Sequence, residues 1–168
     1  MNLVAATKGH GVSLQQLEMA FELVARSDIA DFHGAKSEEL IRQAENALEL
    51  RFPPTYRAFV SRLGCGSLRG YEFCGLIDEN FENSGIPNAV WLALRDRIDC
   101  GLPKSFIPIC DTGLGGYYVI DVSRFNADGD SPVIEFWPGA PDPIGKSCVA
   151  KDFGEFFYER VRDAIERD

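Results

Sequence analysis

The sequence predicts an α+β fold, with a mostly antiparallel sheet of about five strands and helices packed around it. Apolar residues recur at helical spacing through the first 63 positions, and the spacing changes toward two from position 71. Helical spacing then returns after position 152, so helices and strands do not alternate as they do in a doubly wound sheet. The length of 168 residues, 45% of them hydrophobic, suits one packed domain.

Two helices are predicted before position 50. The first spans about 14–27, and Ser13 with Gln16 forms a capping-box pattern at its start. Ser37, followed by two glutamates, opens the second helix, which ends near Leu50. We expect residues 1–12 to form a flexible N-terminus and residues 13–168 to form a single domain, because no linker or repeat divides the chain.

The middle of the chain is predicted to contain two more helices and a strand. Pro54 suits the first position of a helix, and Gly64 marks the end of that helix. Alternating residues then predict a strand over 71–77. The next helix ends before Gly101, and its apolar positions are Val90, Trp91, Leu94 and Ile98.

The last third of the chain is predicted to be mainly strands. We expect strands at 106–110, 117–122, 132–137 and, as a short one, 147–150. The glycine-rich stretch 111–116 is predicted to form a hairpin connection between the first two of these strands. Asp152 and Glu155 form a capping-box pattern that predicts the final helix.

Negative charge is concentrated in the middle of the chain. The net charge is −9, and residues 71–142 alone contain twelve acids and four bases. This balance argues against binding to nucleic acid, whose affinity for proteins depends on Lys and Arg that neutralise phosphates. Two interpretations stay open, a solvated surface that keeps the protein soluble and a docking face for a basic partner.

No pattern in the sequence identifies a catalytic, metal or cofactor site. The five cysteines form no C-x-x-C pair and are expected to be reduced, and the two histidines lie before position 34, away from the cysteines. A calcium loop at 124–135 would begin with Arg124, a cation. Acid–base chemistry remains an alternative, with candidate carboxylates Asp78, Glu79, Asp111 and Asp121.

The chain shows no signal for a membrane or for secretion. The longest apolar run covers only residues 89–94, which is far short of a membrane span of about 20 residues. The first ten residues lack the basic and apolar regions of a signal peptide. We therefore expect a cytoplasmic location.

One segment resembles a known family, the SUKH superfamily, which includes the fungal Smi/Knr regulators. The resemblance is carried by the pattern Ala44-Glu45-x-x-Leu48-x-x-x-Phe52-Pro53-Pro54-x-Tyr56-x-x-Phe59. Residues 106–109, 118–121 and 152–157 look like the central hairpin and closing helix of that family. The sequence departs from the family pattern at Phe52, at Gly64-Cys65-Gly66 and at Gly116-Tyr117.

The resemblance implies a protein that binds another protein and has no catalytic residues. Bacterial members of the family are thought to be immunity proteins that neutralise toxins, often nucleases, and fungal members are regulators. A nuclease is basic where it holds phosphates, so an acidic face can mimic its substrate. We predict that the toxin-docking residues are Glu72, Asp78, Glu79, Glu82, Asp128 and Asp130. The alternatives are a regulatory or scaffolding module with a non-toxin partner and an enzyme or small-ligand binder.

Overall fold

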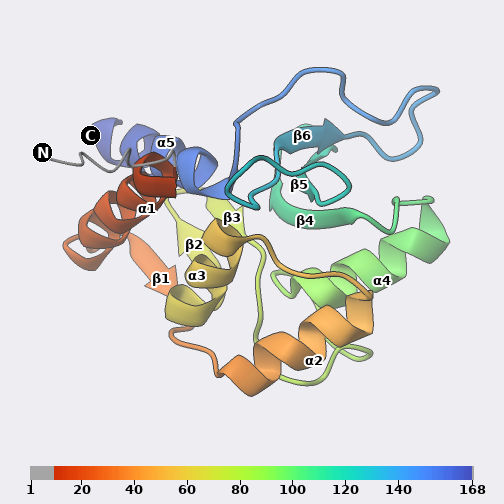
Figure 1. Ribbon diagram of the computed structural model, residues 1–168, viewed down its shortest axis with the longest axis horizontal. Coiled ribbons are helices and arrows are strands. Elements are labelled where there is room, and N and C mark those ends of the chain that lie inside the picture. Colours follow the sequence, from red (N-terminus) through yellow and green to blue (C-terminus); the bar gives the residue numbers. More distant parts are fainter. Residues whose placement is uncertain (1–9, 168) are drawn as a thin grey trace, which may run out of the picture.

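The computed structural model describes residues 10–167, which form five helices and one six-stranded sheet (Figure 1). The helices are α1 (His10–Ala25), α2 (Glu38–Leu48), α3 (Pro54–Leu63), α4 (Ala89–Asp99) and α5 (Phe153–Glu166). The strands are β1 (Ala30–Phe32), β2 (Gly66–Leu68), β3 (Tyr71–Phe73), β4 (Phe106–Asp111), β5 (Tyr117–Asp121) and β6 (Val133–Phe136). The predicted α+β fold is confirmed.

The six strands lie in the sheet in chain order, and every neighbouring pair is antiparallel. Helices α2 and α3 are inserted between β1 and β2, and α4 is inserted between β3 and β4. One face of the sheet packs against α3 and α5, since Phe73 of β3 contacts rings of both helices and Tyr118 of β5 contacts a ring of α5. Helix α1 packs against α5 and α3. Helix α4 packs on the other face over β4, which explains why β4 is buried on both sides.

The centre of the core is an aromatic cluster around Phe59 of α3. The Phe59 ring is fully buried, and five other rings have their centroids 4.9 to 6.3 Å from its own. These neighbours are Phe32, Tyr56, Phe73, Phe153 and Phe157. They come from β1, α3, β3 and α5, so this cluster joins helices and strands that are far apart in the sequence.

The connection from α2 to α3 is fixed by the buried side chain of Glu45. Its carboxylate accepts a hydrogen bond from the backbone N–H of Phe52 at 2.9 Å and another from Arg57 at 3.1 Å. Two prolines in this connection cannot continue α2, and Pro54 occupies the first turn of α3. The glutamate seven residues before Phe52 therefore sets the course of the chain between the two helices.

The start of the chain differs from the prediction. Helix α1 begins at His10, so residues 10–12 are helical, whereas the rest of the expected flexible terminus, residues 1–9, lies outside the described residues. The predicted capping box is wrong, because Ser13 lies inside α1 and its buried hydroxyl donates to the carboxylate of Asp152. Asp152 itself caps α5 as predicted, by accepting the N–H of Glu155 at 2.9 Å.

Two strands, β1 and β2, were not predicted, and two predicted strands are shorter than expected. The strand expected over 71–77 ends at Phe73, and that expected over 147–150 is reduced to a bridge between Ala150 and Val133. The chain leaves β3 next to the end of α3. A Cβ atom added at Gly75 would lie only 1.8 Å from the carbonyl oxygen of Gly64. This close approach requires glycine and ends the strand.

Candidate functional site

The structure places the six predicted docking residues in three parts of the molecule. Glu72 lies on β3 and is exposed. Asp78, Glu79 and Glu82 are exposed in the loop between β3 and α4, and Asp128 and Asp130 belong to the loop between β5 and β6. Asp128 is half-buried and Asp130 is buried, so the six residues are not equally accessible.

Asp130, one of the predicted docking residues, is buried, with only 4% of the residue exposed. One oxygen of its carboxylate accepts hydrogen bonds from the backbone N–H of Thr55 at 3.1 Å and from the Thr55 hydroxyl at 2.9 Å. The same hydroxyl accepts the N–H of Gly154 at 3.1 Å. Asp130 therefore joins the β5–β6 loop to the first turns of α3 and α5.

Replacing Thr55 with valine is expected to lower the free energy of unfolding by about 1–3 kcal/mol, because it removes two buried hydrogen bonds of the hydroxyl. The carboxylate of Asp130 loses the hydroxyl donor and keeps the backbone N–H of residue 55, whereas the N–H of Gly154 loses its acceptor. Urea unfolding of the Thr55→Val and Thr55→Ser variants measures the effect. The serine variant keeps the hydroxyl and should lose less stability than the valine variant. Equal losses in the two would contradict this role of the hydroxyl.

One face of the sheet is uncovered over β1, β2 and β3. Asp31, Ser67 and Glu72 lie opposite one another in register, and all three are exposed. Glu72 and Asp111 adjoin the paired residues Phe73 and Cys110, so their side chains point to the same face. This uncovered face thus carries three carboxylates, those of Asp31, Glu72 and Asp111, which we call the acid row.

The acid row borders a cleft of about 260 Å³. Glu72 and Asp111 line it together with Ile86, Leu92 and Tyr117, so the cleft combines carboxylates with apolar walls. Burial raises the pKa of Tyr117, and the nearby carboxylate of Asp96 raises this pKa further. The phenol of Tyr117 is therefore protonated at neutral pH and can donate a hydrogen bond beside the two acids.

Within the described part of the chain, the charges of the acid row are not balanced by ion pairs. Among residues 10–167, no Lys or Arg forms an ion pair with any of these three carboxylates, whereas Glu18, Glu39 and Glu45 each pair with an arginine. The carboxylate of Asp111 accepts the N–H of Gly113, which holds it in the turn after β4. Unpaired carboxylates fixed on strands present a negative field in a constant direction.

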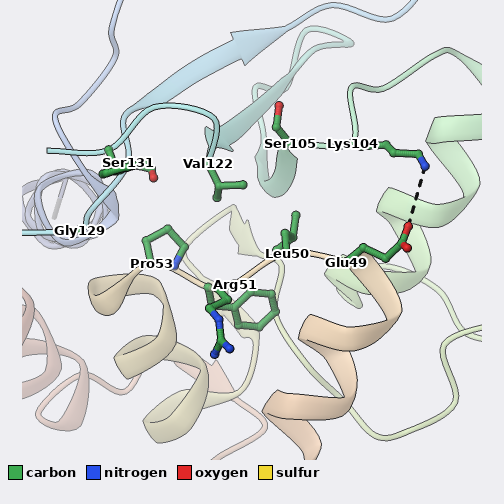
Figure 2. A pocket seen from close by; sticks show the side chains of 11 residues that line it. Glu49, Leu50, Arg51, Pro53, Lys104, Ser105, Val122, Gly129 and Ser131 are labelled. Atoms are coloured by element: carbon green, nitrogen blue, oxygen red, sulfur yellow. Dashed lines mark ion pairs between the residues drawn. The ribbon is translucent and has the colours of Figure 1, made fainter.

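A second concave region of about 500 Å³ lies between the α2–α3 connection and the β5–β6 loop (Figure 2). Leu50, Pro53 and Val122 line it with apolar groups, and Figure 2 shows the ion pair between Lys104 and Glu49 at one end, with the two atoms 3.8 Å apart. Gly129, next to Asp128, also lines this region. Among the described residues that line this region, Glu49 is the one acid, and its carboxylate pairs with Lys104.

The three buried thiols of the chain are poorly suited to nucleophilic chemistry. Cys65, Cys74 and Cys110 are buried free thiols. Burial raises the pKa of Cys65 to about 11 and that of Cys110 to about 12, and it raises the pKa of Cys74 well above its ordinary value. They are therefore protonated at neutral pH, and the thiolate is the reactive form. Residues 10–167 hold no group of three or more His, Cys, Asp or Glu side chains arranged to bind a metal ion.

The family of the chain follows from a comparison with known protein families. The model of the SMI1-KNR4 cell-wall family, SUKH_6, matches residues 38–157, which is more than half of the chain. The chain belongs to the SUKH superfamily. The resemblance predicted from the segment around Pro53 is thereby confirmed, and the SUKH match includes Glu72 and Asp111, whereas Asp31 lies before it. No helix within residues 10–167 of this SUKH protein is long and apolar enough to cross a membrane.

The sequence alone indicated only part of the acid row. Glu72 was predicted as a docking residue, and Asp111 was noted only as one of several acids that could take part in acid–base chemistry. Asp31 was missed because it lies in a strand of three residues, which is too short to show an alternating pattern. The three acids come together only through the antiparallel pairing of β1 to β4.

Proposed function

We propose that this SUKH domain is a non-catalytic immunity protein that binds and neutralises a cognate bacterial toxin, such as a nuclease, in the cytoplasm. The observation that supports this proposal most strongly is the acid row on the uncovered face of the sheet. A nuclease must be basic where it holds the phosphates of its substrate. Carboxylates on this face would attract such a surface and block it.

The position of the acid row suits a docking surface. Its residues lie on hydrogen-bonded strands, and the other face of these strands packs against the aromatic core through Phe32 and Phe73. Such a surface loses little conformational freedom when a partner binds, which favours affinity. The adjoining cleft offers the apolar side chains of Ile86 and Leu92 for contacts that exclude water.

The loop between β3 and α4 extends the proposed surface. Its residue Ile86 lines the same cleft as Glu72. Asp78, Glu79 and Glu82 are exposed in this loop, and we assign them to the outer part of the toxin contact, where charges mainly speed association. Asp128 lies in the β5–β6 loop, and we place it outside the central contact.

A regulatory or scaffolding role is the second candidate. The matching family is named for the cell wall, and this name favours a partner other than a toxin. Both candidates need a protein-binding surface, so the acid row is compatible with each of them. They differ in whether the partner is toxic on its own.

Co-expression with the product of the neighbouring open reading frame tests the proposal. We expect that product to stop growth when it is expressed alone, and the SUKH domain to restore growth and to co-purify with it. A stable complex with a non-toxic product would favour the regulatory role. A toxic product that neither binds the SUKH domain nor loses toxicity in its presence would contradict the proposal.

A further inference from the structure

Within residues 10–167, strand β1 is an uncovered edge of the sheet. The sheet ends at β1 on one side and at β6 on the other. Strand β6 is covered, because Val133 and Phe136 form bridges with Ala150 and Ile144. In the region that the structure describes, no backbone bridge covers the outer side of β1, which lies at the margin of the sheet in Figure 1.

The pairing of β1 with β2 shows which backbone groups point outward. The N–H of His33, just after β1, donates to the carbonyl oxygen of Cys65 at 2.9 Å. Backbone groups alternate in direction along an antiparallel strand, so the N–H and C=O of Asp31 also face β2. The N–H and C=O groups of Ala30 and Phe32 therefore point away from the sheet, where a further strand would pair with them.

We propose that an extended segment of the partner toxin adds a strand to the outer edge of β1 and places a Lys or Arg beside Asp31. This inference rests on the proposed function and specifies how the partner binds. Directly opposite residues on neighbouring strands have Cβ atoms about 4.5–5.5 Å apart. A basic side chain at that position would meet the exposed carboxylate of Asp31 on the face that also carries Glu72.

The edge and the acid row have complementary roles in this mode of binding. Three residues provide only two outward N–H groups, so backbone pairing mainly fixes the register and direction of the added strand. The charge of the acid row supplies the preference for a basic segment. Adding a strand at this edge would extend the row of side chains that runs from Asp31 through Ser67 to Glu72.

Amide hydrogen exchange in the free chain and in its complex with the toxin tests the inference. In the free chain, the N–H of Asp31 should exchange slowly, and those of Ala30 and Phe32 should exchange fast. In the complex we expect the exchange of Ala30 and Phe32 to slow by at least about tenfold, because each gains a backbone partner. A complex in which these two amides exchange as in the free chain would overturn strand addition and leave the proposed function standing. Failure to form any complex would overturn both.

Two variants at one position provide an independent test. Ala30→Pro removes an outward N–H, and an edge strand tolerates proline where that N–H faces solvent. Ala30→Ser keeps the N–H and serves as the matched control. We expect the proline variant to bind the toxin up to about tenfold more weakly, as the loss of one hydrogen bond predicts, and the serine variant to bind like the wild type. Equal affinity of the two variants would overturn the inference. If the proline variant does not fold, the hydrogen-exchange experiment on the wild type tests the inference instead.

Discussion

The Phe59→Ala substitution is expected to lower the free energy of unfolding by about 3–5 kcal/mol. Phe59 is fully buried, and its ring contacts five other aromatic rings, so alanine leaves a cavity that rigid neighbours cannot fill. Since domains of this size are stable by about 5–15 kcal/mol, the loss is a large fraction of the total. Urea unfolding followed by tryptophan fluorescence measures it.

Phe125→Ala is the matched control for this prediction. The side chain of Phe125 is 75% exposed in the β5–β6 loop, so the same chemical change should alter the free energy of unfolding by no more than about 0.5 kcal/mol. If the free energy of unfolding falls by the same amount in both variants, the burial of Phe59 does not account for its contribution to stability. A smaller loss in Phe59→Leu than in Phe59→Ala would further support the role of the cavity.

Reversing the charge of the acid row is expected to weaken toxin binding by at least about 100-fold at low salt. The variant combines Asp31→Lys, Glu72→Lys and Asp111→Asn. Asparagine is chosen at position 111 because its side-chain oxygen can still accept the N–H of Gly113 in the turn. Binding by the wild type should itself weaken as the salt concentration rises, because salt screens exposed charges. Isothermal titration at two salt concentrations measures both effects.

The control for this variant changes the net charge by the same amount elsewhere. It combines Glu22→Lys, Glu159→Lys and Asp142→Asn, three exposed acids of which the first two lie on α1 and α5. Helix α5 covers the opposite face of the sheet, and α1 packs against α5. If the control and the acid-row variant weaken binding equally, the effect comes from the net charge, and the assignment of the acid row is wrong.

Apart from the start of α1, helices and their ends could be predicted well from the sequence, because their signals are local. Helix α3 runs from Pro54 to Leu63 as expected, since Pro54 fits the first turn and Gly64 follows the last. The carboxylate of Asp152 caps α5 for the same reason. The family pattern around Glu45 is also local, and the structure explains its glutamate through the hydrogen bond to the N–H of Phe52.

The acid row and the buried role of Asp130 could not be predicted, because both depend on contacts between distant positions. Strand β1 has three residues, and only its pairing with β2, more than thirty positions later, gives Asp31 its place. Aspartate in a glycine-containing turn is typical of an exposed loop, which is why Asp130 was expected at the surface. Its partner Thr55 lies 75 positions away, and no local pattern reveals that contact.

Growth of cells that express the toxin is the most direct test of the central claim, that the acid row carries immunity. The toxin would be co-expressed with the wild-type chain, with the acid-row variant or with the matched control, at equal levels of soluble protein. The account predicts growth with the wild type and with the control, and growth arrest with the acid-row variant. Full protection by the acid-row variant would contradict it.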